Sequence, residues 1–566
     1  MCGFLAILDT ADSPGAARTL AARGEALLDT LAHRGPDERG LWCGDGAWLG
    51  HRRLAIMAPE DGHQPLDDGR AVWVSNSEIY NASALMDELG PPGCGGGVCA
   101  SDSRAIGPVL ERFGVGGLAR FDGQFAIACV DRASGDWIVG RDHMGICPLY
   151  VGFHENGSIW FASEMKALVD DCARVGLVEP GTAWVCEGGT PRLVKWYDPA
   201  WARSVPDRPA DPAALRESLI ASVAARTASD APWGVLLSGG LDSSLVASIA
   251  SRLVRKRGGG PIHTFSIGLD GSPDLEKARL VASHIGSAHH EFRFTIPEAM
   301  DALPAVVEHL ESDQQIRTGV PTYLLGKRVR EMGFKMVLSG EGADEIFGGY
   351  LYFHRAPSPA AFHEETVRKT TRLHQYDVMR ANKAPMASGL ELRFPLLGRA
   401  FVDHSMGIDP SDRMIPRDGR WAGAEKALLR EAFRGGDWLP RAILERRKEQ
   451  FSDGVGYGWV DALRDKAESI VSDAAMARAP AAHPELTPAN KEMFWMRELF
   501  EARFVSGRAS GRSVLSTLGD GRSVACSTPE ALAWDPAWSS MSGDISGRTM
   551  GALHASGAAG PESAAG

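Results

Sequence analysis

Two stretches of the chain have residue types and spacings that could do chemistry. The first is Cys2, which becomes the N-terminal residue if the initiator methionine is removed. A free α-amino group has a pKa of about 8, so it is a usable general base at neutral pH on the same residue as the thiol. Cys2 could then be a nucleophile without a catalytic histidine. From position alone a buried or incidental cysteine is the commoner case, so this site needs support from the rest of the chain.

The second stretch is LLSGGLDSS, residues 236–244. An apolar, strand-like run ends in the Gly-Gly turn, and a segment with leucine and isoleucine on one helical face follows. A strand that turns through Gly-Gly into a helix directs backbone N–H groups and the positive end of the helix dipole at one point, which suits a phosphate. Asp242 fits beside a phosphate if a divalent cation lies between them. An ordinary serine-rich turn with a helix cap is the alternative.

Strand-like and helix-like segments alternate around this loop. The runs 233–237, 263–268 and 334–338 resemble strands, and helical patterns follow the first two. This alternation predicts a parallel sheet covered by helices on both faces, with ligands at the carboxyl ends of its strands. A second loop, SGEGADE at 339–345, lies at such an end. Acidic turns are often solvated or cap helices; the alternative is that Asp242 and Asp344 share a Mg²⁺ ion.

The first two hundred residues have a different pattern. Residues 4–9 form an apolar run typical of a strand buried on both faces, and residues 18–31 have the spacing of a helix. Further strand candidates follow, at 125–130, 137–140 and 160–163. Mostly strands with one or two helices predict a sheet sandwich between helical layers. We therefore expect a domain at 2–196, a proline-rich linker at 197–212, a second domain at 213–510, and a tail at 511–566 that is partly disordered, above all at 555–566.

Composition excludes several classes of protein. The chain has 566 residues, of which 44% are hydrophobic and 23% charged, with a net charge of −12. The acidic balance and the lack of a basic block argue against a nucleic-acid partner. No run is long enough for a membrane span or a signal sequence, and nine cysteines without such a signal predict reduced thiols in the cytoplasm. Cys94 and Cys99 lack neighbouring ligands for a zinc site.

The motifs MCGF, HRGPD, GHRRLAI, NSEIYN, GRDHMGICPLY and FASEMKAL resemble the glutaminase half of class II glutamine amidotransferases. The resemblance implies an N-terminal-nucleophile αββα sandwich in which Cys2 attacks the glutamine side-chain amide and releases ammonia. It also implies that Asn76 and the N–H of Ser77 form the oxyanion hole. The implied glutamine-binding residues are Arg53, Leu54, Ala55, Ile56 and Met57 for the α-carboxylate, and Glu78 and Asp102 for the α-amino group. These residue types suit the charges that they would bind.

Ser77 departs from this family's pattern, which usually has glycine there. A serine keeps the backbone N–H, so the oxyanion hole survives if φ is negative. A positive φ would cost about 1–2 kcal/mol, and a displaced donor about 3 kcal/mol of transition-state stabilisation. Ser77 therefore predicts slower glutamine hydrolysis than in family members with glycine at this position. It also leaves open an enzyme that uses mainly free ammonia as its nitrogen source.

The SGGLDSS string resembles the pyrophosphate-binding loop of ATP pyrophosphatases. With SGEGADEIFGGY, RANKAPMASGLELRFPLL and RRKEQFSDGVG, the second half resembles the α/β, parallel-sheet nucleotide-binding domain of glutamine-hydrolysing asparagine synthetases of the bacterial B type. The resemblance implies ATP and Mg²⁺, with Asp242 and Asp344 as metal ligands. The implied ATP contacts are Leu236, Ser238, Gly239, Gly240, Asp242, Ser243, Ser244, Ile267, Ser339 and Gly340. Glu341 would serve acyl-adenylate formation, and Lys448 would steady negative charge; by itself Lys448 is one charge of a solvated helix face.

The implied reaction makes asparagine, AMP, pyrophosphate and glutamate from aspartate, ATP, glutamine and water through β-aspartyl-AMP. Gln314-Gln315 stand where the family usually has Thr-Thr, which leaves amidation of a different acid open. A glutamine- or nucleotide-sensing protein is the non-enzymatic alternative. We expect only small-molecule partners, and a homodimer is left open.

Overall fold

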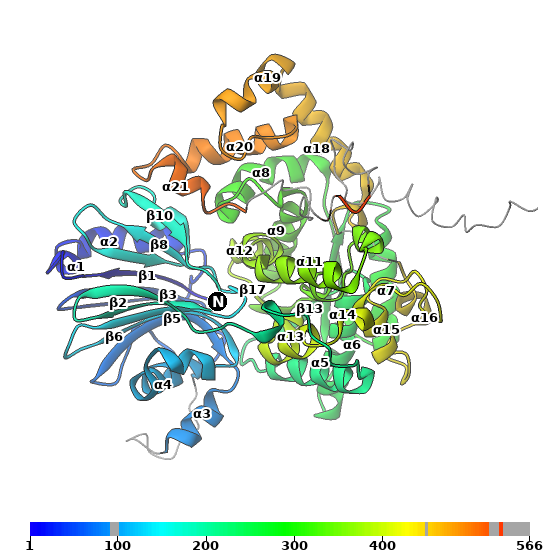
Figure 1. The fold of residues 1–566 in the computed structure, drawn as a ribbon, viewed down its shortest axis with the longest axis horizontal. Coiled ribbons are helices and arrows are strands. Elements are labelled where there is room, and N and C mark those ends of the chain that lie inside the picture. Colours follow the sequence, from blue (N-terminus) through cyan, green and yellow to red (C-terminus); the bar gives the residue numbers. More distant parts are fainter. Residues whose placement is uncertain (91–100, 448–450, 520–530, 532, 536–566) are drawn as a thin grey trace, which may run out of the picture.

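The computed structural model describes residues 1–90, 101–447, 451–519, 531 and 533–535. Lys448, Cys94, Cys99 and the predicted disordered end at 555–566 lie outside the described residues. Two domains lie side by side in Figure 1, an N-terminal domain in blue to cyan and a C-terminal domain in green to orange.

The N-terminal domain is built on two six-stranded antiparallel sheets, ordered β10-β8-β9-β1-β3-β2 and β12-β11-β7-β6-β5-β4. Its strands are β1 (Gly3–Leu8), β2 (Glu38–Gly44), β3 (Ala47–Arg53), β4 (Leu66–Asp67), β5 (Ala71–Ile79), β6 (Gly123–Asp131), β7 (Trp137–Arg141), β8 (Tyr150–Phe153), β9 (Ile159–Ala162), β10 (Arg174–Leu177), β11 (Thr182–Glu187) and β12 (Thr190–Lys195). Its helices are α1 (Ala16–Thr19), α2 (Ala21–Leu28), α3 (Ala82–Leu89) and α4 (Ile106–Phe113), with short 3₁₀ turns η1 (Asp29–Leu31), η2 (Asp102–Ala105), η3 (Gly114–Arg120) and η4 (Met165–Ala167).

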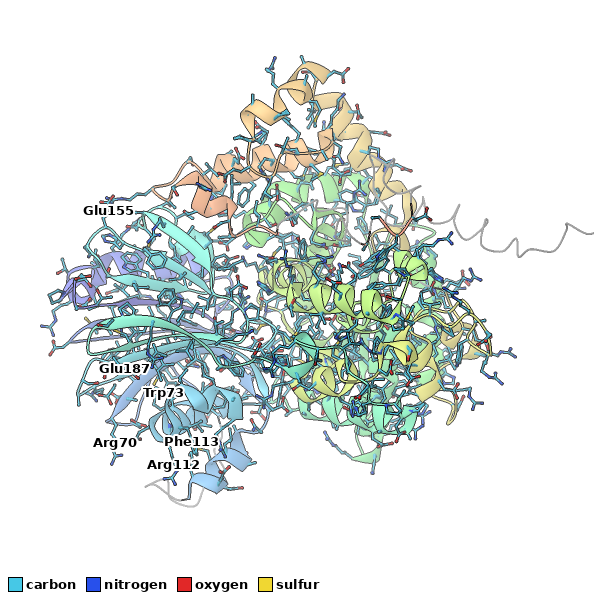
Figure 2. The ribbon with its side chains drawn as sticks, viewed as in Figure 1. Arg70, Trp73, Arg112, Phe113, Glu155 and Glu187 are labelled. Atoms are coloured by element: carbon cyan, nitrogen blue, oxygen red, sulfur yellow. The ribbon has the colours of Figure 1, made fainter. Side chains whose placement is uncertain are left out.

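The burial of its strands shows that the N-terminal domain consists of two sheets between helical layers. All six residues of β1 are buried, because α2 packs on β1 and β3 while β5 of the other sheet contacts their inner face. On the outer face of the second sheet, α4 packs on β5, and Trp73 lies in the apolar core between them (Figure 2). The predicted sandwich between helical layers is confirmed. The single helix predicted at 18–31 is divided into α1, α2 and η1, since Leu20 leaves the helical conformation with φ −93° and ψ 2°.

The C-terminal domain is built on a five-stranded sheet, ordered β15-β14-β13-β16-β17, in which every pair is parallel. Its strands are β13 (Trp233–Leu236), β14 (His263–Gly268), β15 (Ala288–Arg293), β16 (Met336–Leu338) and β17 (Glu391–Arg393). The predicted parallel sheet is confirmed, and the loop LLSGGLDSS joins β13 to a helix as expected.

Helices surround this sheet. They are α5 (Pro212–Arg226), α6 (Leu241–Lys256), α7 (Pro273–Ile285), α8 (Ile296–Leu310), α9 (Ile316–Glu331), α10 (Ala343–Ile346), α11 (Pro359–Thr371), α12 (Asp377–Met386), α13 (Arg399–Met406), α14 (Pro410–Arg413), α15 (Ala427–Ala432), α16 (Arg441–Leu444), α17 (Phe451–Gly454), α18 (Tyr457–Ile470), α19 (Asp473–Ala482), α20 (Lys491–Phe504) and α21 (Gly511–Leu515). The 3₁₀ turns are η5 (Ala200–Ala202), η6 (Leu351–Arg355), η7 (Leu373–Gln375) and η8 (Pro395–Leu397). No helix in the described part of the chain is long and apolar enough to cross a membrane.

Several contacts join the two domains. The segment between β12 and α5 packs on α13, where Trp201 donates to Asp403 at 2.8 Å. The N-terminus lies between the domains beside β17 (Figure 1), and its amino group pairs with Glu391. Buried Lys383 of α12 pairs with Glu311 at 2.6 Å and donates to Tyr150 of β8. The residues expected to release ammonia and those expected to use it therefore belong to one packed body.

Candidate active sites

Cys2 lies immediately before β1, next to the N-terminus at the domain interface. Its backbone N–H donates to Asn76 Oδ1 at 2.8 Å, and its Sγ lies 4.0 Å from the Leu54 carbonyl oxygen. Burial raises the pKa of the Cys2 thiol, against the opposing effect of the nearby terminal amino group. Because Met1 is attached here, the Cys2 nitrogen is an amide, and it becomes a base only when Met1 is removed.

Asn76 is fully buried on β5 beside this thiol. Its Oδ1 accepts from Cys2, while its Nδ2 has no hydrogen-bond partner among the residues that the structure describes. Buried amide donors are rarely left unpaired in folded proteins. A donor in this state next to a nucleophile fits an oxyanion hole that is completed when substrate arrives.

Ser77 lies within β5 and has no positive φ. Its hydroxyl donates to Ser75 Oγ at 2.8 Å and lies 3.4 Å from Ser103 Oγ. Because side chains alternate along a strand, this hydroxyl points to the opposite face from Asn76. The strain expected for a positive φ therefore does not arise.

We expect Ser77→Gly to leave the rate of glutamine hydrolysis within about threefold of wild type, because no backbone strain is relieved and the side chain faces away from Asn76. The variant loses the hydrogen bond to Ser75 and gains chain entropy when unfolded, so the free energy of unfolding should fall by about 1–2 kcal/mol. Glutamate release and urea unfolding measure these two quantities. A tenfold faster hydrolysis would contradict the argument, since it would mean that the serine obstructs the oxyanion hole.

Arg53 shapes the loop that follows β3. Its guanidinium donates to the carbonyl oxygens of Ala58 at 2.7 Å, Pro59 at 2.8 Å and Met57 at 3.1 Å, and it pairs with Glu38 at 2.8 Å. The intervening predicted residues Leu54, Ala55 and Ile56 are buried in the same loop. Arg53 thus holds together the wall that was predicted to bind the glutamine α-carboxylate.

Of the two predicted ligands of the α-amino group, Glu78 belongs to β5 and Asp102 is the first residue of η2. Glu78 is buried and lies 2.7 Å from the guanidinium of Arg393, which comes from β17 of the other domain. Asp102 Oδ2 accepts from the N–H of Ile79 at 2.6 Å. Burial raises the pKa of the Asp102 carboxyl to about 6. Burial also raises the pKa of the Glu78 carboxyl well above its ordinary value, against the opposing charge of Arg393. The site therefore combines two buried acids that hold their protons to a higher pH than exposed carboxyls do.

Strand β17 serves both halves of the protein. Glu391 and Arg393 pair with each other at 2.7 Å and face the N-terminal domain, whereas Leu392 between them lines a pocket of the C-terminal domain. Side chains alternate across a strand, so three successive residues can reach both sites. Sequence reasoning missed Glu391 and Arg393; the acid–apolar–base triplet was the available signal.

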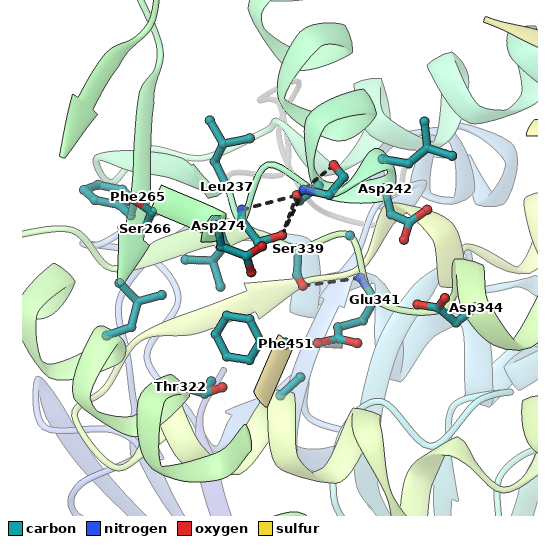
Figure 3. A pocket seen from close by; sticks show the side chains of 18 of the residues that line it. Leu237, Asp242, Phe265, Ser266, Asp274, Thr322, Ser339, Glu341, Asp344 and Phe451 are labelled. Carbon is teal, nitrogen blue, oxygen red and sulfur yellow. Dashed lines mark hydrogen bonds between the residues drawn. The ribbon is translucent and has the colours of Figure 1, made fainter. Parts of the chain in front are cut away.

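The pocket of the C-terminal domain lies at the carboxyl ends of β13, β14 and β16 (Figure 3). Most of the predicted nucleotide residues line it, namely Leu236, Ser238, Gly240, Asp242, Ser243, Ile267, Ser339, Gly340, Glu341 and Asp344. Gly239 of the loop and Ser244 of α6 are not among the lining residues. The two glycine-bearing loops thus share one cavity.

Close packing explains why glycine is needed in these loops. A Cβ on Gly340 would lie 2.5 Å from the backbone nitrogen of Ser243, so the loops touch where they cross. Gly239 has a φ of +74° and approaches Lys277 equally closely. The hydroxyls of Ser238 and Ser243 lie 3.1 Å apart at the N-terminus of the 16-residue helix α6. Such a terminus, with hydroxyls and free N–H groups, is suited to bind phosphate.

Five acidic residues line the pocket, and cations hold the three that belong to the two loops and to α6 and α10, namely Asp242, Glu341 and Asp344. Glu341 pairs with Arg380 at 2.7 Å, while Lys426 contacts both Asp242 and Asp344. Asp242 Oδ1 is buried and accepts no hydrogen bond from the described residues. Mg²⁺ is usually held by one or two carboxylates together with substrate phosphates, so this donor set fits it. Sequence reasoning missed Lys426 and Arg380, which lie far along the chain from both loops.

Comparisons with known proteins agree with the two sites. A glutamine amidotransferase domain family matches residues 1–180, and the asparagine synthase family matches residues 214–360 and 355–517. Asparagine synthetase [glutamine-hydrolyzing] 2 of Oryza sativa subsp. japonica is 46% identical, over 98% of this chain and 93% of its own. Asparagine synthetase [glutamine-hydrolyzing] 3 of Arabidopsis thaliana is 44% identical, over 98% and 96%. The resemblance inferred from the motifs is confirmed, and the chain belongs to the family of glutamine-hydrolysing asparagine synthetases.

Proposed function

We propose that this protein is an ATP-dependent ligase that transfers the amide nitrogen of glutamine to aspartate. The observation that carries this proposal is that the two glycine-bearing loops share one pocket whose lining strand, β17, also contacts the glutaminase residue Glu78. Ammonia alone cannot displace oxide from a carboxylate, so an activating site is needed; the second site supplies the ammonia from glutamine. The family membership supports the same reaction.

In the N-terminal site, Cys2 Sγ would attack the glutamine amide carbon after Met1 is removed. The α-amino group of Cys2 takes the thiol proton and returns it to the leaving ammonia. Asn76 Nδ2 and the Ser77 N–H would bind the oxyanion, and Arg53, Glu78 and Asp102 would hold the amino-acid end. Water then cleaves the thioester and releases glutamate.

In the C-terminal site, an oxygen of the aspartate side chain attacks the α-phosphorus of ATP, and pyrophosphate leaves toward the N-terminus of α6. Leu236 and Ile267 would contact the adenine. Bound Mg²⁺, held by Asp242 and Asp344, would neutralise charge on the phosphates. Ammonia then attacks the activated carbonyl of β-aspartyl-AMP, AMP leaves, and asparagine forms. Glu341 and Lys448 are proposed to act at the reacting centre.

The titration of Asp102 gives the glutamine site a pH dependence. Below a pH of about 6 its carboxyl is protonated and neutral, so the attraction for the α-ammonium group of glutamine is lost. We expect kcat/KM for glutamine to fall as pH drops through this value, because this parameter follows the free enzyme. The rate of glutamate release between pH 5 and 8 measures it. Glu78 is a second buried acid of this site with a raised pKa, so Asp102→Asn should weaken this inflection and lower kcat/KM at pH 8.

The proposed reaction is tested by measuring aspartate-dependent pyrophosphate release, first with glutamine and then with ammonium. Equal stoichiometry of pyrophosphate, AMP and asparagine is the expected result. Gln314 donates to the Gly519 carbonyl at 3.1 Å, and neither it nor Gln315 lines the pocket, which supports aspartate as the acid. A faster reaction with another acid in a panel would overturn this assignment, and a wild type that ignores glutamine would favour an ammonia-fed enzyme.

We also propose a cytoplasmic location, which the free cysteines of the described residues support, since such thiols persist in a reducing compartment. A homodimer remains a prediction, and light scattering of the purified protein tests it.

A further inference from the structure

The ammonium group of Lys426 lies between the two carboxylates of the pocket. Its Nζ is 2.8 Å from Asp344 Oδ1 and is hydrogen-bonded to Asp242 Oδ2. The lysine side chain is 3% exposed, and the two carboxylates are 14% and 16% exposed. One cation therefore joins the first turn of α6 to the first turn of α10.

The surrounding backbone is fitted to this lysine. Lys426 has a φ of +57° at the start of α15, a conformation that a non-glycine residue keeps only where its surroundings fix it. A Cβ on Gly349 would lie 2.3 Å from Lys426 Cε and 2.0 Å from Asp344 Oδ1. Glycine at 349 thus makes room for the lysine stem and the aspartate to meet.

The charges explain what this arrangement does. Two carboxylates that converge in a largely buried pocket repel each other unless a cation lies between them. The ammonium supplies that positive charge through Asp242 Oδ2 and Asp344 Oδ1, while Asp242 Oδ1 accepts no hydrogen bond from the described residues. A metal ion bound by both aspartates would therefore meet the positive charge of Lys426 and compete with it for these carboxylates, which lowers the affinity of the pocket for the metal alone.

We propose that Lys426 is a positioning residue that closes the two-aspartate site to free divalent cations until a polyphosphate enters. This inference rests on the proposed function, in which Asp242 and Asp344 hold the metal. A polyphosphate offers the displaced ammonium a new anionic partner, so its binding removes the cost of displacing the lysine. Metal and polyphosphate then bind with positive coupling, and neither aspartate is left without a cation at any stage.

The test measures binding of Mn²⁺ alone to the full-length protein, by the electron paramagnetic resonance signal of the free ion. Lys426→Met keeps the length of the side chain and removes the charge, and it should bind Mn²⁺ at least about tenfold more tightly than wild type. Adding Asp242→Asn to this variant should abolish the gain. Lys491→Met is the matched control, because Lys491 also contacts two carboxylates, those of Glu468 and Asp473, but on the surface. It should leave the affinity unchanged.

A second measurement uses the wild-type protein, so it does not depend on whether a variant folds. After the Mn²⁺ that pyrophosphate binds in protein-free samples is subtracted, inorganic pyrophosphate should tighten Mn²⁺ binding to the protein by at least about tenfold, and this coupling should shrink in Lys426→Met. Equal Mn²⁺ affinity of the wild type and a folded Lys426→Met variant, or no effect of pyrophosphate on the wild type, overturns the proposal. Either result leaves the proposed function standing if aspartate-dependent pyrophosphate release is intact, so the two failures are distinguishable.

Discussion

Replacing Cys2 with alanine should lower glutamine-dependent synthesis by roughly 10⁴-fold or more, the order expected when an enzyme loses its covalent nucleophile. Synthesis from ammonium should stay within about threefold of wild type, because ammonia enters after the step that Cys2 performs. The argument rests on the position of Cys2 beside Asn76, whose amide donor has no partner among the described residues. Asparagine formation with each nitrogen source measures both rates.

The matched control is Cys43→Ala, since Cys43 is an exposed cysteine of the same domain. It should leave both rates unchanged. If Cys2→Ala kept glutamine-dependent synthesis, Cys2 would not be the nucleophile, and the glutaminase assignment would fail. If it also lost the ammonium-dependent reaction, circular dichroism would show whether the domain interface around β1 had been disturbed.

Replacing Asp242 with asparagine should lower pyrophosphate release by roughly 10²–10³-fold with either nitrogen source, because a metal that polarises phosphoryl groups contributes several kcal/mol to the transition state. Hydrolysis of glutamine should persist, since Asp242 lies in the pocket of the other domain. This pattern is the reverse of that expected for Cys2→Ala. Pyrophosphate and glutamate assays on the same preparation record both activities.

Asp270→Asn provides the comparison, because Asp270 is a mostly exposed carboxylate of the same domain that pairs with Arg293. It should leave pyrophosphate release unchanged. An active Asp242→Asn variant would remove Asp242 from the phosphate site. Loss of both activities would instead indicate that the two domains do not work independently. The ion pair between Arg393 and Glu78 joins the domains and could transmit such an effect.

The two sites also separate an enzyme from a sensing protein. Binding a nucleotide requires the loop 238–240 and the N-terminus of α6. It does not require Cys2 beside the side-chain amide donor of Asn76 in the other domain. Asn76 Nδ2 is buried and has no hydrogen-bond partner in the part of the chain that the structure describes, which costs stability. Such a cost is typical of a group kept for catalysis.

Sequence by itself determined the local parts of this protein. The strand–turn–helix pattern around LLSGGLDSS predicted β13, the loop and α6, because glycine conformation and helical spacing are set by neighbours in the chain. The same holds for β14, which was predicted at its observed limits. The order of strand-like and helix-like hydrophobic patterns along the chain also predicted both fold classes, since a parallel sheet and a sheet sandwich require different orders of strand and helix.

Only the tertiary structure decided which side chains meet. Lys426 and Asp242 are 184 residues apart, and no local pattern distinguishes this lysine from an exposed one. Arg393 reaches Glu78 because β17 is the edge strand that faces the other domain, and Ser77 is unstrained because β5 extends through it. Contacts of this kind depend on how the sheets pack, and packing free energy is gained between residues whose separation along the chain is arbitrary.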